Sequence, residues 1–302
     1  MKIIVFGLLV FINSNLSGQT AIEWNYKGAI KNEAGDHTGA ISDFNKAIEL
    51  EPYNVSSYSN RGLAKLILED FRGAILDYSK VIELNPNDSM AYLYRGMAKE
   101  YLKDYPGAIL DFNKAIELEQ SNKDLYYIRG LTKIKLDDFK GGIIDFTKAI
   151  QLDPSYEECY FNRGIAKGRL EDHRGAILDF NKSIELNPGD KASIYNRGLT
   201  KFYLEDYRGA ILDFTKAIKL QPSSFESYSN RGLAKINLKD YKGAISDYNK
   251  AIELAPSDPT AYYLRGLAKS FLNDTNGACL DFSKAGELGL GKAYDAIQDL
   301  CN

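Results

Sequence analysis

A glycine-rich segment near the C-terminus is the feature of this sequence that most suggests catalysis. Residues 286–292 read GELGLGK and match G-x-x-x-x-G-K, the loop that cradles nucleotide phosphates. The next residue is Ala293, which lacks the hydroxyl that such a loop uses to hold magnesium, and a helical rather than a strand pattern precedes the segment. We interpret the segment as a flexible glycine joint between helices.

The residue types that bind metals or act as nucleophiles show no chemical spacing. The chain has two histidines, His37 and His173, and three cysteines, with neither Cys-x2-Cys nor His-Glu-x-x-His spacing. No nucleophile, base and orienting group come together. A net charge of −3 provides no basic footprint for nucleic acid. We therefore expect no enzyme, no cofactor, no metal site and no nucleic-acid partner.

A 34-residue period organises the chain. The nonapeptide SYSNRGLAK at residues 57–65 returns at residues 227–235, five periods later. Eight units align without an insertion, and within each we number positions 1 to 34. The units are residues 21–54, 55–88, 89–122, 123–156, 157–190, 191–224, 225–258 and 259–292.

Each unit predicts two closely packed helices. Positions 2–14 and 17–30 carry apolar residues at three- and four-residue spacing, which is typical of amphipathic helices. Aspartate at position 16 can cap the second helix, and proline at position 32 in six units can end it. Glycine at position 8 and small residues at positions 20 and 27 let the helices approach around an aromatic residue at position 24. Glycine also recurs at position 19, for which close backbone approach is our only explanation.

This pattern resembles the tetratricopeptide repeat (TPR), with an aromatic residue at position 4, Gly at 8, Ala at 20, an aromatic residue at 24 and Pro at 32. The resemblance implies an all-α fold: an α-solenoid, a right-handed superhelix of eight helix-turn-helix units with a capping helix at residues 293–302. Two positions depart from the family pattern. Position 7 is Arg or Lys instead of Leu in all eight units, and position 11 is Lys instead of Tyr.

The basic residues at positions 7 and 11 share one helix face, and an aspartate recurs at position 23 on the second helix. We interpret them as a lattice of interhelical ion pairs, worth about 0–1 kcal/mol for each exposed pair. The alternative is a cationic track for an acidic ligand, which the aspartate row would neutralise.

The first twenty residues differ from the repeats. After Met1 and Lys2, ten apolar residues follow, too few to span a bilayer but suited to the core of a secretory signal. We expect residues 1–20 to be a signal peptide and the mature chain to be exported, periplasmic or secreted, without membrane insertion. A buried N-terminal helix is the alternative.

The cysteines leave two possibilities open. An odd number in an oxidising compartment leaves a free thiol or an intermolecular bridge. Cys279 and Cys301 both lie near the C-terminus and could form a disulfide, but sequence cannot supply the geometry. We favour buried free thiols for all three, including Cys159.

The TPR resemblance implies that positions 2, 5, 6, 9, 12 and 13 of the first helices line a concave surface. In the middle units these positions are apolar and aromatic, which suits protein recognition, although they could instead pack only between adjacent helices.

Asparagines at position 6 could hydrogen-bond the backbone of an extended peptide, because a side-chain amide offers both a donor and an acceptor. This row resembles the asparagine ladder in the repeat superhelix of the O-linked N-acetylglucosamine transferases. Alternatively, the amides bond only a neighbouring helix. The expected peptide-binding residues are Asn60, Tyr127, Phe161, Asn162, Tyr195, Asn196, Phe202, Tyr203 and Asn230.

A non-catalytic protein–protein interaction scaffold is the function that these features predict, with a peptide or partner helix held in the concave groove. The alternative is a structural or assembly module of the cell envelope, acting by self-association or through convex surfaces; the oligomeric state stays open. SYSNRGLAK also resembles the segment of chaperone-binding TPR proteins that clamps a C-terminal carboxylate. Only one of the five clamp residue types is present here, so we expect no carboxylate-clamp chaperone binding.

Overall fold

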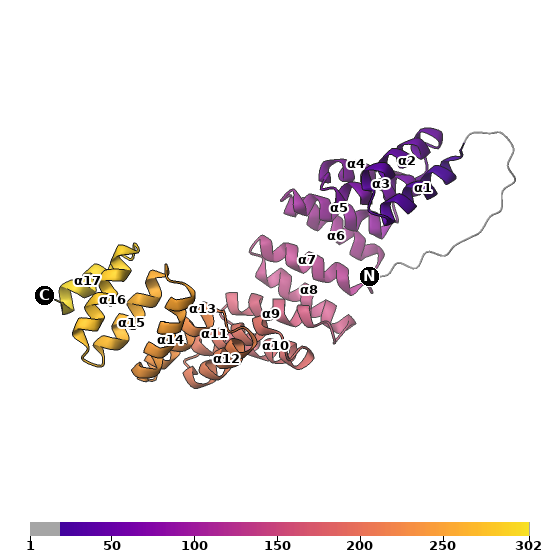
Figure 1. The fold of residues 1–302 in the computed structure, drawn as a ribbon. Helices are drawn as coiled ribbons and strands as arrows, with labels where there is room; N and C mark the ends of the chain where they lie inside the picture. The colour runs from indigo at the N-terminus through magenta and orange to yellow at the C-terminus, as the bar shows by residue number, and fades with distance from the viewer. Residues whose placement is uncertain (1–18, 302) are drawn as a thin grey trace. The chain divides into compact units, whose positions relative to one another are not determined.

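The described part of the chain, residues 19–301 of this computed structural model, consists of seventeen α-helices without a strand (Figure 1). The expected signal peptide lies almost entirely in residues 1–18, outside the described residues. None of the seventeen helices is long and apolar enough to cross a membrane.

Each repeat unit forms two helices, and the first of them begins at the first residue of the unit. The first helices are α1 (Ala21–Glu33), α3 (Val55–Ile67), α5 (Ser89–Tyr101), α7 (Lys123–Lys135), α9 (Glu157–Arg169), α11 (Lys191–Tyr203), α13 (Phe225–Asn237) and α15 (Pro259–Ser270). The second helices are α2 (His37–Leu50), α4 (Phe71–Leu84), α6 (Tyr105–Leu118), α8 (Phe139–Leu152), α10 (His173–Leu186), α12 (Tyr207–Leu220), α14 (Tyr241–Leu254) and α16 (Thr275–Glu287). The chain ends with α17 (Lys292–Leu300), which packs against α16.

The helices form two compact bodies that divide after Gln120, with α1–α6 in the first and α7–α17 in the second. Within each body, a first helix packs on the second helix of its own unit, and that second helix packs on the first helix of the next unit. Successive first helices also touch one another, so they share one face of the stack. This is the all-α solenoid packing that the repeat pattern predicts.

Every second helix begins at an aspartate cap, and the cap explains the glycine at position 19. Asp206 accepts a hydrogen bond of 2.9 Å from the backbone N–H of Gly209. A Cβ atom on Gly209 would lie 2.0 Å from the Asp206 Oδ2 atom. The glycine therefore leaves room for the capping carboxylate, whose interaction with the orphan N–H groups stabilises the helix start.

The glycine at position 8 permits close packing of the two helices of a unit, as the sequence predicts. A Cβ atom on Gly96 would lie 2.6 Å from the ring of Phe112, which is fully buried. The aromatic residue at position 24 thus fills the space that the glycine leaves open, and close contact of this kind supplies much of the packing energy in each unit.

The phosphate-loop lookalike joins two helices. Gly286 lies near the end of α16, Gly289 has a φ of +98°, and α17 begins at Lys292. A Cβ atom on Gly286 would lie 2.9 Å from the ring of Tyr294. The glycines therefore provide a left-handed turn and close contact with the last helix.

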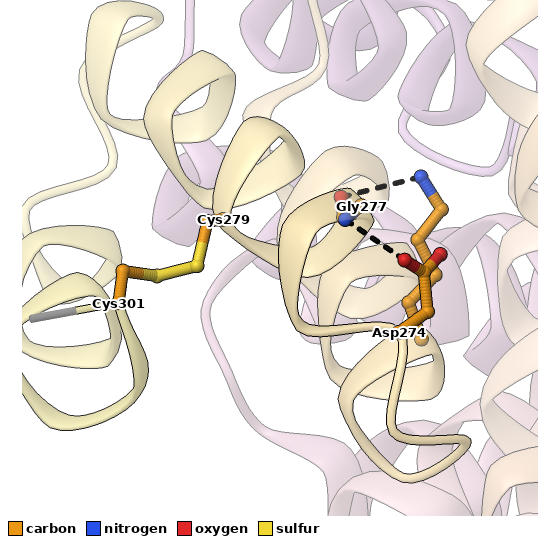
Figure 2. The surroundings of a disulfide bond; sticks show 5 residues. Asp274, Gly277, Cys279 and Cys301 are labelled. Carbon is orange, nitrogen blue, oxygen red and sulfur yellow. Dashed lines mark hydrogen bonds between the residues drawn. A yellow bond between two sulfur atoms is a disulfide. The ribbon is translucent and has the colours of Figure 1, made fainter.

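The expectation of three free thiols is wrong for two of the cysteines. Cys279 on α16 and Cys301 after α17 form a disulfide with a Cα–Cα distance of 5.9 Å (Figure 2). The helical turn between α16 and α17 brings the two residues together, which spacing along the chain could not show. Cys159 is a buried free thiol, and burial raises its pKa to about 12.

The cysteine arrangement predicts a fixed thiol count. The native chain should not react with a thiol reagent, because Cys159 is buried and its raised pKa keeps it protonated at neutral pH. In urea without reductant one thiol per chain should react, and after reduction three should react, as measured by the absorbance of released thionitrobenzoate. A Cys159→Ser variant provides the control and should show none before reduction. Three reactive thiols in the unreduced, unfolded chain would exclude the disulfide.

Candidate peptide-binding face

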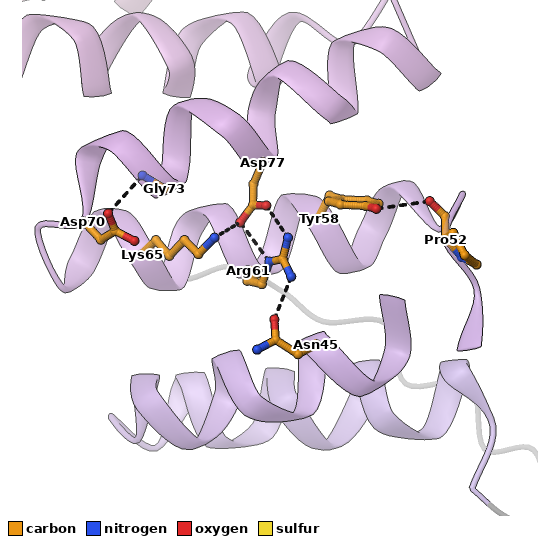
Figure 3. A network of polar contacts seen from close by, with 8 residues as sticks. All are labelled: Asn45, Pro52, Tyr58, Arg61, Lys65, Asp70, Gly73 and Asp77. Carbon is orange, nitrogen blue, oxygen red and sulfur yellow. Dashed lines mark hydrogen bonds and ion pairs between the residues drawn. The ribbon is translucent and has the colours of Figure 1, made fainter. Parts of the chain in front are cut away.

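A buried ion pair fixes the orientation of each first helix. In unit 2, Arg61 donates two hydrogen bonds to the carboxylate of Asp77, at 3.0 and 2.5 Å, and Lys65 approaches the same carboxylate at 2.8 Å (Figure 3). Arg61 also donates a 2.6 Å hydrogen bond to the side chain of Asn45 in the preceding unit, and its guanidinium carbon lies 5.4 Å from the ring centroid of Tyr58. Asp77 is only 3% exposed.

The same contact recurs along the chain. Seven arginines at position 7 bind the aspartate at position 23 through two N–H groups. These pairs are Arg61–Asp77, Arg95–Asp111, Arg129–Asp145, Arg163–Asp179, Arg197–Asp213, Arg231–Asp247 and Arg265–Asp281. In unit 1, Lys31 pairs with Asp43 at 2.6 Å.

The recurring pairs confirm an ion-pair lattice but correct its expected energy. The aspartates are buried, so the value for exposed pairs does not apply, and removing one partner would leave buried charge without compensation. The basic side chains point at these carboxylates, which argues against a cationic track on the surface. The departures from the TPR pattern at positions 7 and 11 therefore belong to the core.

The expected binding residues lie on first helices, and all except Asn60 belong to the second body. The position 6 amides use their N–H groups within the fold. Asn162 donates to the backbone oxygen of Glu158 at 2.8 Å, and Asn196 donates to that of Ala192 at 2.9 Å.

Three of the amides, those of Asn60, Asn162 and Asn230, reach a neighbouring first helix. Asn230 donates to the Tyr195 hydroxyl at 2.7 Å, and Asn60 donates to Asn25 at 3.1 Å. These contacts support the alternative that the amides bond neighbouring helices. Each amide nevertheless has a second N–H and a carbonyl oxygen. Among the described residues, no hydrogen-bond donor lies against the Oδ1 atoms of Asn162, Asn196 and Asn230. Their acceptor capacity therefore remains available.

Tyr127 and Tyr195 extend this polar row. Both hydroxyls accept from the asparagine of the next unit, at 3.5 Å from Asn162 and 2.7 Å from Asn230. Burial raises the pKa of both tyrosines, so the phenols stay protonated and can donate.

The other aromatic residues of the expected site divide into packing and exposed groups. The ring of Phe161 lies 6.1 Å from that of the buried Phe180, and the ring of Phe202 lies 5.2 Å from that of Tyr207. These contacts indicate that both phenylalanines pack between helices. Tyr203 is 69% exposed, so it is the member of this group most open to a ligand.

Asn196 lines two cavities. A cavity of about 360 Å³ lies between units 6 and 7, and a second of about 480 Å³ lies between units 5 and 6. The lining residues of the first include Lys191, Tyr195, Asn196, Gln221 and Glu226. Those of the second include Gly168, Arg169, His173, Asn196 and Tyr203.

The sequence-based site contains only three of these lining residues, Tyr195, Asn196 and Tyr203. Glu226 lies at a position expected to line the concave surface, and Lys191 lies next to one. Sequence reasoning did not single them out, because many other surface residues are also charged. Gly168 carries a clearer signal, since it is the one glycine at position 12 among the eight units.

The packed helix pairs and their 34-residue period define a helical repeat protein. Sequence models described as tetratricopeptide repeat match residues 59–124, 124–156, 157–190 and 192–224, and a TPR repeat model matches residues 235–270. The chain belongs to the tetratricopeptide repeat family.

Several solved structures share the fold. YrrB, described as a TPR protein with an unusual peptide-binding site, is 27% identical over 61% of this chain and 95% of its own, with a TM-score of 0.55. MamA is 25% identical over 53% of this chain and 94% of its own, with a TM-score of 0.52. The C-terminal part of a TPR protein from Cytophaga hutchinsonii is 20% identical over 78% of this chain and 97% of its own, with a TM-score of 0.68. Among curated proteins, no sequence matches.

Removing one buried carboxylate should strongly destabilise the array. An Asp213→Ala substitution leaves the charges of Arg197 and Lys201 without their partner and should lower the free energy of unfolding by about 3–5 kcal/mol. Urea unfolding followed by circular dichroism measures the change. Lys182→Ala breaks an exposed pair with Glu185 and should leave the transition unchanged. Equal effects of the two substitutions would contradict the importance of burial.

Proposed function

We propose that this chain is a binding scaffold that holds an extended peptide along the first helices of units 4 to 7. The observation that carries this proposal is that Asn196 lines two cavities, with Asn162 and Asn230 at the same position in the adjacent units. An extended peptide has backbone N–H and C=O groups without internal partners, and side-chain amides can serve both.

The residues around the asparagines favour a peptide over a small metabolite. The cavities open along a row of first helices, and phenol hydroxyls of Tyr127 and Tyr195 alternate with the amides. This spacing distributes polar contacts over several units instead of gathering them at one point. The TPR family membership supports protein interaction in general, and the similar protein YrrB is described as having an unusual peptide-binding site.

We also propose that the mature chain is exported. This rests on the basic start and apolar stretch within residues 1–20, which suit a secretory signal. The disulfide between Cys279 and Cys301 supports it, because disulfides persist in oxidising compartments.

A triple substitution tests the peptide-binding proposal. Peptides are selected from a random phage library on the immobilised wild-type chain, and their affinity is measured by calorimetry. Asn162→Ala, Asn196→Ala and Asn230→Ala together should abolish binding, because the backbone loses its amide partners. The melting temperature should change little, since these side chains are only half-buried.

The matched control is Asn60→Ala, which removes the same amide from the first body. Its peptide affinity should equal that of the wild type. If the triple variant keeps the wild-type affinity, the asparagine row does not bind the peptide.

A second candidate function, assembly through the surface of the second helices, is favoured by one observation. Position 22 carries a large aliphatic residue in six units, and these side chains are 68–73% exposed: Leu76, Leu110, Ile144, Leu178, Leu212 and Leu280. Scattered exposed leucines are normal, but one at the same position of most units is not scattered.

Sedimentation velocity tests this assembly function. If the aliphatic residues mediate self-association, the sedimentation coefficient should rise with protein concentration in the wild type. Leu178→Ser with Leu212→Ser should remove that rise, because it replaces apolar contacts with hydroxyls. A concentration-independent monomer would exclude self-association through this surface.

A further inference from the structure

The cavity between units 5 and 6 has an aromatic wall and an apolar floor. The rings of His173 and Tyr203 stack with centroids 5.6 Å apart and an interplanar angle of 10°. Ile165, Leu199 and the buried ring of Phe180 line the cavity as well. Since Asn196 also lines it, the cavity is continuous with the proposed path of the peptide backbone.

The same hollow occurs between units 2 and 3, where a leucine partly fills it. That cavity measures about 300 Å³ and is lined by residues at equivalent positions: Leu66, Ile67, Glu69, Phe71, Met97 and Tyr101. Its wall is the stacked pair Phe71–Tyr101, with centroids 4.6 Å apart. The two hollows therefore share one architecture.

One difference between their linings is the residue at position 12. Leu66 occupies it in unit 2 and Gly168 in unit 5. A Cβ atom on Gly168 would meet no heavy atom within 4 Å, so the glycine is not required by packing. The cavity with glycine at this position measures about 480 Å³ and reaches the ring of Phe180. A helix-destabilising glycine inside α9 thus opens a space instead of relieving a clash.

We propose that this cavity, which we term the Gly168 pocket, binds an aromatic side chain of the peptide. The inference rests on the proposed peptide-binding function and names the side chain that anchors it. Rings of Tyr203, His173 and Phe180 offer stacked and edge contacts to a further ring, and the volume admits an indole.

The two charged lining residues of the Gly168 pocket favour neither a cationic nor an anionic side chain. Arg169 and Glu171 both line it and carry opposite charges, so a peptide carboxylate or ammonium would meet attraction and repulsion together. A neutral aromatic residue buries its ring and leaves its backbone near the Asn196 amide. Aromatic anchors in pockets of this kind carry much of the binding energy in many interfaces.

The test uses N-acetyl-L-tryptophanamide as the probe and the full chain with labelled isoleucine and leucine methyl groups. Titration should shift the methyl resonances of Ile165 and Leu199, and N-acetyl-L-alaninamide should not. Gly168→Leu should weaken probe binding at least tenfold by restoring the leucine found in unit 2. Its melting temperature should stay the same or rise, because leucine favours helix more than glycine and the added Cβ atom meets nothing.

The matched gain-of-function variant is Leu66→Gly, which should open the equivalent hollow and give a second probe site with shifts at the labelled methyl groups of Ile67. Absence of wild-type binding, or wild-type affinity in the Gly168→Leu variant, would overturn the proposal. The probe has no extended backbone, so Asn162→Ala with Asn230→Ala should bind it normally. Selected peptides that bind Gly168→Leu as tightly as the wild type would refute the pocket while leaving the asparagine row intact.

Discussion

The contact between the arginine at position 7 and the buried aspartate at position 23 is the constraint on which the repeat depends. A carboxylate taken out of water is costly unless charged donors surround it, and here a guanidinium and an ammonium do so with bidentate geometry. The contact joins the first and second helices of one unit, and one further N–H of the arginine reaches the preceding unit. Charge and hydrogen-bond direction therefore set a relative rotation of the helices that apolar packing alone would leave loose.

This constraint leaves the remaining face of the first helix available for binding. The side chains at positions 7 and 11 bind the buried aspartate, and the glycine at position 8 packs against the aromatic ring at position 24. Positions 6, 9, 12 and 13 then face the shared surface of successive first helices, where Asn196, Gly168 and Tyr203 lie. Residues can vary there from unit to unit without disturbing the helix pair, so different units can contribute different contacts to one ligand.

The repeat pattern was sufficient to predict the helix pairs, because cap, glycine and aromatic positions each act within one unit. The capping aspartates and the packing of Gly96 on Phe112 follow directly from this local logic. Features that depend on distance between units could not be predicted in the same way. The Cys279–Cys301 bridge requires the turn at Gly289. The asparagine row was predictable as a row, but its hydrogen bonds to Tyr195 and Tyr127 depend on the spacing between adjacent first helices.

The arginines at position 7 donate hydrogen bonds to the preceding unit, so these contacts all run in one direction along the chain. Arg163 and Arg197 each donate to a polar side chain of the unit before, Thr147 and Asn181. After the last repeat unit, the disulfide links α17 covalently to α16. In a one-dimensional array, the order in which units detach follows the strength of the links at its ends. The last unit should therefore detach late, because the disulfide cross-links it to α17 and Arg265 donates a hydrogen bond to Asn249 of the preceding unit.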